Sequence, residues 1–373
     1  MTKISSVLIA GDCGPAHGRA DGFPIESYTE LVRPVLEKAD FRFVNCMRTY
    51  SSRGEYGEHA RQVCQPIEMA DIFSHGLFDA VTMANNHSYD SGPNAMLDTR
   101  ALFNSRGIQV TGAGRDLAEA RMPAVIERNG VRIGYLGYTS VGTPESTAGP
   151  TKPGVMNVRI RTAYETRGPH TPVRIRTEPH PDDLSMLLED IAALRKQVDV
   201  AVLAFHAGVI RLPRVIADYQ IAVAHAAIDA GTDLVVGHAP HVPKAIEVYK
   251  GKTIFYSLGV FAMTKPFAAP SWSEPAWAHG AVRNYADLDP QYPLMPYGKA
   301  STLGLLAKAR VSREGLLRTS FLPMVIDKQY RPELLRQNDP RFAELLAYME
   351  WASADMPHHF AIEGDEVIVS DPQ

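Results

Sequence analysis

The sequence has few cysteines and lacks long apolar or basic runs, and each absence excludes a class of protein. Only three of the 373 residues are cysteine (Cys13, Cys46 and Cys64), and no pair has CxxC spacing. Neither a disulfide framework nor a cysteine-based zinc knuckle is therefore expected. No stretch approaches the roughly 18 apolar residues that a membrane span requires, and no run of lysine or arginine would follow a phosphate backbone. These absences exclude a transmembrane protein and a nucleic-acid partner.

The composition that remains is that of a globular enzyme. Hydrophobic residues make up 45% and charged residues 21% of the chain, and 38 basic against 42 acidic side chains give a net charge of −4. Both fractions are ordinary for a soluble α/β protein. The N-terminal apolar run is short and leads directly into Gly11-Asp12, which indicates a first strand and not a signal peptide. We therefore expect a cytoplasmic protein.

Short apolar runs alternate with amphipathic stretches through roughly the first 260 residues, which predicts a layered α/β fold. Ten runs, many rich in β-branched and aromatic residues, are the predicted strands: Ser6–Ala10, Phe41–Asn45, Phe78–Ala84, Ile108–Thr111, Val125–Arg128, Arg132–Tyr138, Val198–Phe205, Leu234–Gly237, Ala245–Tyr249 and Thr253–Ser257. Apolar residues three and four apart predict helices at Gly92–Asn104, Asp182–Lys196 and Tyr219–Ala230.

Two segments break this alternation. Residues 142–181 are rich in Pro, Gly, Thr, Arg and His, which is typical of a lid, although a mobile surface insertion stays equally open. Residues 265–299 are rich in proline and aromatic residues and could line a pocket or simply pack. A hairpin is predicted at 301–323 and a last helix at 341–351. We expect one catalytic domain over residues 1–330 and a helical extension over residues 331–373.

Polar side chains follow four of the predicted strands. They are Asp12 after the first strand, Asn86 and His87 after the third, His206 after the seventh, and His238 with His241 after the eighth. Open α/β sheets bind ligands at the edge where their parallel strands end. Imidazole, carboxylate and amide oxygen are all ligands of divalent metals. The four strand ends together predict a metal site, with Mn²⁺, Zn²⁺ or Fe²⁺ as candidates and one or two ions.

Three further side chains are candidates for catalysis at this site. His87 is a candidate general acid, and the carboxylate of Asp90 would orient its imidazole. His17 lies five residues beyond Asp12 in a glycine-rich loop, from which it could act as an acid or contact the substrate. The other histidines have no comparable setting.

The motifs, taken in order, resemble those of the CapA family of poly-gamma-glutamate capsule-synthesis proteins. They are Gly11-Asp12, Asn85-Asn86-His87 with Asp90, His206-Ala207-Gly208, Gly237-His238-Ala239-Pro240-His241-Val242 and Phe255-Tyr256-Ser257-Leu258-Gly259. That family is similar in fold to calcineurin-like metallophosphatases. The resemblance covers about Ile4 to Phe261 and implies a four-layer α/β/β/α sandwich with a divalent metal at the loop edge. It implies the same metal positions, Asp12, Asn86, His206, His238 and His241, with His87 beside the reacting group.

The sequence departs from the family pattern at three positions. Asn45-Cys46-Met47 stands where the family has Asn-Leu-Glu, so the acidic residue that would bridge two ions is missing. Either one metal binds, or Asn45, Cys46 or Glu55 substitutes for the acid. Cys46 could alternatively be a buried apolar residue. Ala239 replaces a second histidine, and Val260 replaces an asparagine.

These observations predict a metal-dependent hydrolase of an amide, peptide (including gamma-glutamyl) or phosphoester bond, acting through a metal-activated water. Two alternatives stay open: a metal-dependent epimerase or isomerase of a peptide or carboxylate, and a non-catalytic metal-containing component of polymer biosynthesis. The substrate would be a small molecule or peptide that carries a carboxylate or phosphate. The candidate substrate-binding residues are Asn45, Cys46, Arg53 and Asn85. Arg53 is a candidate because a guanidinium binds a carboxylate or phosphate bidentately. A homodimer is compatible with the sequence.

Overall fold

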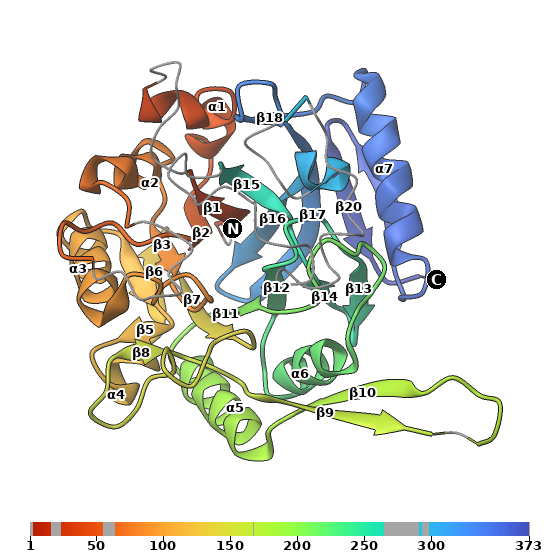
Figure 1. Cartoon of the computed structure of the whole chain (residues 1–373). Helices are drawn as coiled ribbons and strands as arrows, with labels where there is room; N and C mark the ends of the chain where they lie inside the picture. Colours follow the sequence, from red (N-terminus) through yellow and green to blue (C-terminus); the bar gives the residue numbers. More distant parts are fainter. Residues whose placement is uncertain are drawn as a thin grey trace.

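Two β-sheets pack face to face at the centre of the molecule, and helices cover their outer faces (Figure 1). This computed structural model describes residues 3–15, 24–54, 64–166, 168–264, 291–292 and 298–372. In these residues the larger sheet has ten strands and the smaller sheet has six. The layers are therefore helix, sheet, sheet and helix, which confirms the predicted α/β/β/α sandwich.

The larger sheet combines a parallel half with an antiparallel half. Strand β1 pairs in parallel with β2 and β15, and β2, β3 and β4 continue the parallel order. On its other side β1 pairs antiparallel with β16. The strands are β1 (Ser5–Gly14), β2 (Phe41–Cys46), β3 (Ala80–Thr82), β4 (Gln109–Thr111), β15 (Val260–Met263), β16 (Leu303–Ser312), β17 (Gly315–Ile326), β18 (Pro332–Leu334), β19 (His359–Glu363) and β20 (Glu366–Ser370).

The smaller sheet has four parallel strands at its centre and an antiparallel strand at each edge. Its order is β13-β14-β12-β11-β7-β6, with parallel pairing from β14 through β7. The strands are β6 (Ala124–Arg128), β7 (Val131–Thr139), β11 (Val200–His206), β12 (Leu234–His238), β13 (Ile246–Tyr249) and β14 (Lys252–Phe255). The parallel register places His206 directly beside His238.

Most helices cover the outer faces of the two sheets, whereas α7 (Pro340–Ser353) packs on the apolar cluster between the sheets. In α5 a proline occupies the first turn and two aspartates follow it, which suits the free N–H groups and positive dipole at a helix start. The helices are η1 (Ile25–Thr29), α1 (Arg33–Leu36), η2 (Ile67–Ala70), α2 (Asp71–His75), α3 (Gly92–Ser105), α4 (Leu117–Ala120), α5 (Pro181–Arg195), α6 (Asp218–Asp229), η5 (Lys299–Thr302) and α7 (Pro340–Ser353). Among the described residues, no helix is both long and apolar enough to cross a membrane. The cytoplasmic location stays a prediction.

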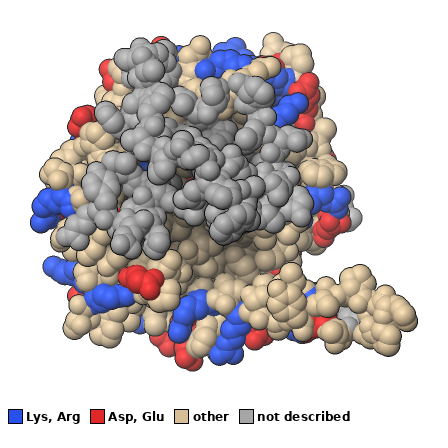
Figure 2. All heavy atoms as spheres, in the orientation of Figure 1, with Lys and Arg blue, Asp and Glu red and all other residues tan. Residues whose placement is uncertain are grey.

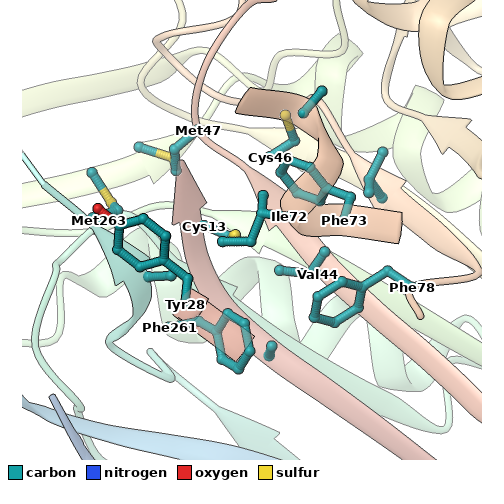
Figure 3. Packing of buried hydrophobic residues seen from close by; sticks show 14 of the residues in the cluster. Cys13, Tyr28, Val44, Cys46, Met47, Ile72, Phe73, Phe78, Phe261 and Met263 are labelled. Atoms are coloured by element: carbon teal, nitrogen blue, oxygen red, sulfur yellow. The ribbon is translucent and has the colours of Figure 1, made fainter. Parts of the chain in front are cut away.

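Buried apolar side chains fill the space between the layers. Between the sheets, the rings of Phe43 and Tyr135 stack with their centroids 4.4 Å apart, so they join β2 to β7. A second cluster lies between the larger sheet and its helices (Figure 3). A third fills the space between the smaller sheet and α5 and α6. Burial on both faces explains why the central strands read as continuous apolar runs.

Two regions differ from the sequence prediction. Residues 142–181 are not an irregular lid throughout, because β8 (Gly154–Val155) pairs with β5 (Ala113–Gly114), and β9 (Ile160–Glu165) pairs with β10 (Arg174–Pro179). Residues 331–373 contain the expected helix α7, but three strands also join the larger sheet there. They were missed because β18 is short and β19 is largely exposed. Most of the proline-rich segment 265–299 lies outside the described residues.

Candidate metal centre

The polar strand ends meet at one edge of the molecule, where both sheets end. Asp12 is near the end of β1, and Asn45 is beside it on β2. His206 and His238 are the last residues of β11 and β12 in the other sheet. The Nε2 atom of His238 lies 3.3 Å from the carbonyl oxygen of Ala10, so this imidazole reaches across from one sheet to the other.

Close backbone approaches explain why glycine precedes both Asp12 and His238. The Asp12 N–H donates to the Gly259 carbonyl at 3.0 Å, and the Leu258 N–H donates to the Gly237 carbonyl at 3.1 Å. A Cβ added to Gly11 or to Gly237 would lie 2.1 Å from a carbonyl oxygen of this same segment. Only glycine permits that approach, so the 256–259 turn fits between the two strand ends.

The loop after β12 has an unusual backbone that turns His241 back toward Asp12. Ala239 and His241 have φ angles of 96° and 58°, in the left-handed region that residues with a Cβ rarely adopt. The Arg211 N–H donates to the Pro240 carbonyl at 2.9 Å and so helps to hold the loop. Such conformations cost energy and concentrate at functional sites.

A hydrogen-bonded network begins at the buried carboxylate of Asp12. One oxygen lies 3.0 Å from His241 Nδ1, and the other accepts from Asn45 Nδ2 at 2.8 Å. The same Asn45 nitrogen lies 3.2 Å from His206 Nδ1. Because the amide has two hydrogens, it donates one to the carboxylate and the other to the imidazole. His206 Nδ1 is therefore the acceptor nitrogen, and its proton is on Nε2.

The network continues from His206 to Asp90 through Asn86 and His87. His206 Nε2 lies 3.0 Å from Asn86 Oδ1, and Asn86 Nδ2 lies 3.2 Å from His87 Nε2. His87 Nδ1 lies 2.7 Å from an oxygen of Asp90. Since the amide donates to Nε2, the proton of neutral His87 is on Nδ1, where it donates to Asp90. The network therefore specifies one tautomer for each of the two histidines.

The electrostatics of the network favour an anionic Asp12 carboxylate and neutral His206 and His238 imidazoles. Burial alone would raise the pKa of Asp12, but the hydrogen bond to His241 and the nearby histidines outweigh it and hold that pKa well below its usual range. Burial lowers the pKa of His206 far below its ordinary value and also lowers that of His238. Neutral imidazole and ionised carboxylate are the protonation states that bind metals.

The donor chemistry of these residues fits a divalent ion. Carboxylate, imidazole and amide oxygen are all present, and the buried Nδ1 of His238 has no hydrogen-bond partner among the described residues. Over the same residues, no three His, Cys, Asp or Glu side chains are already arranged as a metal-binding group. Asn45 forms hydrogen bonds with both Asp12 and His206, which are two of the candidate ligands.

Two predicted residues, Cys46 and Arg53, lie apart from the network. Cys46 points to the face of β2 opposite Asn45, where its thiol donates to the Arg48 carbonyl, and burial raises its pKa to about 12. Figure 3 shows Cys46 and Met47 among apolar side chains, so neither replaces the missing acid. Arg53 pairs with Asp98 on α3. His17 and Glu55 lie outside the described residues.

Asn85 has a structural place beside the network. Its amide donates to Asn45 Oδ1 at 3.1 Å and to the Cys46 carbonyl at 2.7 Å. Its own oxygen accepts from the His87 backbone N–H at 3.0 Å. Asn85 therefore fixes the positions of Asn45 and His87 through three hydrogen bonds. Whether it also contacts a substrate, as the sequence predicted, stays a prediction.

The sequence reasoning missed a buried lysine next to the histidine loop. Lys244 follows His241 by three residues, is fully buried, and donates to the Val215 carbonyl at 2.6 Å. Burial lowers its pKa to about 7. Lysine is almost never fully buried, so the residue type gave no reason to expect this burial. The only signal in the sequence was the position of Lys244 directly after the histidine motif.

Replacing Lys244 with methionine is expected to stabilise the protein most at neutral pH. The folded-state pKa is below the unfolded value of about 10.4, so wild-type stability falls as the pH falls from 10 toward 7. Between pH 8.5 and 7.0 this loss is about 1.5 kcal/mol. Urea unfolding of wild type and Lys244→Met at both values measures it, with Lys250→Met on the surface as control. An equal stability difference at both pH values would contradict the prediction.

Comparison with known proteins relates this geometry to a family. A family profile described as "Bacterial capsule synthesis protein PGA_cap" matches residues 6–265. The "PGA biosynthesis protein CapA" of Bacillus subtilis (strain 168) is 29% identical over 239 residues, which is 63% of this chain and 56% of that protein. A "Probable polyglutamine synthesis accessory protein" of Mycobacterium tuberculosis (strain H37Rv) is 31% identical over 60% of this chain and 56% of its own length. The match thus spans little more than half of each relative.

Solved structures give more distant similarities. A hypothetical protein from Thermus thermophilus aligns over 88% of this chain and 98% of its own, with 15% identity and a TM-score of 0.44. The calcineurin-like phosphoesterase YfkN from Bacillus subtilis aligns over 85% of this chain and 88% of its own, with 10% identity and a TM-score of 0.42. Because the family profile covers well over half of the sequence, the chain belongs to the bacterial capsule synthesis protein PGA_cap family.

Proposed function

We propose that this protein is a metal-dependent hydrolase whose active site is the network from Asp12 to Asp90. The observation that carries the proposal is the continuity of this network, in which side chains from both sheets meet at the strand ends through hydrogen bonds of 2.7 to 3.2 Å. Asp12, Asn45 and His206 are buried, and buried polar side chains are costly unless their hydrogen bonds are satisfied. A set of independent capping or core residues would not form one connected chain.

Asp12, His206, His238 and His241 would hold the ion, with the oxygen of Asn86 as a further ligand. Asp12 brings the negative charge, and its low pKa keeps it ionised throughout the neutral range. When bound, a divalent ion supplies Lewis acidity toward a carbonyl or phosphoryl oxygen and lowers the pKa of a coordinated water. We propose one ion and not two, because Met47 is buried in the apolar cluster where the family has a bridging acid.

His87 would move the proton at the reacting group. In the tautomer inferred from the hydrogen bonds its Nδ1–H donates to Asp90, so Nε2 is the nitrogen that would take up and return a proton. Nε2 lies 3.2 Å from Nδ2 of Asn86, a proposed ligand, which supports this role. Asp90 would hold the ring in place and stabilise the imidazolium that forms when Nε2 is protonated.

An amide bond is the substrate bond that we favour over a phosphoester. The names of the relatives refer to PGA and polyglutamine synthesis, and such polymers are joined by amide bonds. Hydrolysis of a gamma-glutamyl amide needs a polarised carbonyl and a proton donor for the leaving amine. The proposed ion and His87 would meet these two needs. A positively charged side chain would also be needed to bind the carboxylate of the substrate.

The proposal is tested by metal analysis and by turnover of defined substrates. Wild type and a His238→Ala/His241→Ala variant are purified identically, and their metal is measured by plasma mass spectrometry. We expect near-stoichiometric metal in wild type and at least a tenfold loss in the variant. A His358→Ala/His359→Ala variant, which changes two histidines at the start of β19, serves as the matched control.

The activity arm of this test separates the hydrolase from its two alternatives. Gamma-glutamyl anilide, gamma-linked oligoglutamate and phosphodiester substrates are assayed in D₂O with the metal that co-purifies. Release of amine from the gamma-linked substrates supports the proposal. Deuterium at an α-carbon without cleavage would select the epimerase, and bound metal without any product would select a non-catalytic role.

A further inference from the structure

A two-stranded arm projects from the body of the molecule beside α6 (Figures 1 and 2). It consists of β9 and β10, which pair antiparallel with Tyr164 opposite Ile175. The arm is attached through β10, because Arg174 and the Thr177 N–H both contact the carboxylate of Asp218 at the start of α6. The strand β9 therefore lies on the side of the arm that is away from α6.

One face of the arm is apolar and exposed. Tyr164 is 75% exposed, its cross-strand partner Ile175 is 59% exposed, and Val173 is 50% exposed. Isolated two-stranded hairpins are marginally stable in water, and they need further strands or a packed face. Large apolar side chains gathered on such an element indicate that it is covered by a partner.

The outer edge of β9 also lacks a pairing strand. In the described part of the chain β9 pairs with β10 alone. Natural proteins protect such edges with proline, lysine or a covering segment, because unpaired backbone groups invite another strand. Between Ile160 and Glu165 the strand contains neither proline nor lysine. Its two charged residues are instead Arg161 and Glu165, four positions apart, and Glu165 also pairs with Arg176 of β10 at 3.0 Å within the arm.

We propose that β9 pairs antiparallel with β9 of a second copy of this chain, about a twofold axis at Ala163. In that register Arg161 of each copy lies opposite Glu165 of the other, so two oppositely charged pairs form at once. The small side chain of Ala163 meets its own copy at the axis without a clash. The two hairpins become one four-stranded sheet, β10-β9-β9-β10.

The other face of this sheet supports the same register. Side chains alternate between faces along a strand, so Tyr164 lies on the face opposite Arg161 and Glu165. In the proposed pairing Tyr164 meets Thr162 of the second copy, and each aromatic ring lies near the axis. The apolar face is then continuous across both arms. If the pairing shifted by one residue, Arg161 would no longer lie opposite Glu165. The two charged pairs therefore select the proposed register.

Sedimentation equilibrium of the full chain tests the proposal through paired charge reversals. Wild type is expected to show a reversible monomer–dimer equilibrium, and Arg161→Glu or Glu165→Arg alone to weaken it about tenfold or more. Mixing the two single variants should restore the dimer, because each contact then joins a glutamate to an arginine. Arg115→Glu, an exposed reversal near α4, is the control and should leave association unchanged.

The mixing experiment also covers the case in which a variant arm is distorted. Two distorted arms would not recover association when mixed, whereas two repelling but folded arms would. A wild type that is monomeric at every concentration would overturn the proposal. The proposal would also be overturned if Arg161→Glu left the dimer intact, or if mixing the two variants failed to restore it. Either result would assign the interface to another surface.

Discussion

Replacing Asp12 with asparagine is expected to remove the proposed metal and with it the hydrolytic activity. Asp12 is completely buried and ionised, and its two oxygens contact His241 and Asn45. Asparagine has nearly the same shape but no charge, so it cannot offset the charge of a divalent ion. Loss of a residue that hydrogen-bonds to a metal ligand typically lowers metal affinity by roughly 10- to 100-fold. Asp12 is itself a proposed ligand, so we expect a larger loss.

Calorimetric titration of the metal-free protein measures this loss, and a matched aspartate provides the control. Asp233 is also largely buried, but it lies at the opposite end of β12, where it contacts Arg195 and Lys252. Asp233→Asn should lower the free energy of unfolding and leave metal affinity unchanged. Equal metal affinity in wild type and Asp12→Asn would remove Asp12 from the site and contradict the proposal.

The sequence predicted the positions of the strand ends but not the bonds between them. The strand before His206 is a run of apolar residues that ends abruptly in a histidine, and the structure places that histidine at the last position of β11. The hydrogen bond from Asn45 to His206 joins residues 161 positions apart. It depends on how the two sheets pack, which no local pattern records. The tautomers of His206 and His87 follow from those hydrogen bonds, so the sequence could not predict them either.

Cys46 shows where a local rule would have improved the prediction. Adjacent residues in a strand point to opposite faces, so Asn45 and Cys46 could not both reach the site from β2. Once Asn45 is paired with Asp12, Cys46 must enter the apolar cluster on the other face, as observed. The sequence analysis considered both a metal ligand and a buried apolar residue at Cys46, and strand periodicity would have selected the buried residue.

The arm was missed for a different physical reason. Strand prediction relies on apolar residues that a core demands at every second position. In β9 and β10 only the base of the arm packs on the body, through Ile160 and Thr177, so charged and polar residues occupy most positions. Such a segment resembles a loop until its pairing is known. Strand β19 is largely exposed as well and was missed likewise.

Replacing His87 with alanine is expected to lower kcat by about 10²- to 10⁴-fold and to leave bound metal in place. That range is typical for loss of a general acid or base. His87 is not among the four proposed charged or imidazole ligands, so the measured metal content should stay at the wild-type level. A structural role would instead lower the melting temperature together with kcat. Activity against a gamma-glutamyl substrate and metal analysis of the same sample distinguish the two roles.

Asp90→Asn completes the test, because it changes the tautomer of His87 without removing the ring. The aspartate accepts the proton of Nδ1 at 2.7 Å, but an asparagine amide can donate to Nδ1 and so place the proton on Nε2. That tautomer cannot take up a proton at the reacting group, so kcat should fall about 10- to 100-fold. In His87→Ala/Asp90→Asn the second change should add nothing, because Asp90 acts only through the imidazole. Additive losses in the double variant would show that Asp90 has a role of its own and that the two residues do not form a proton-transferring pair.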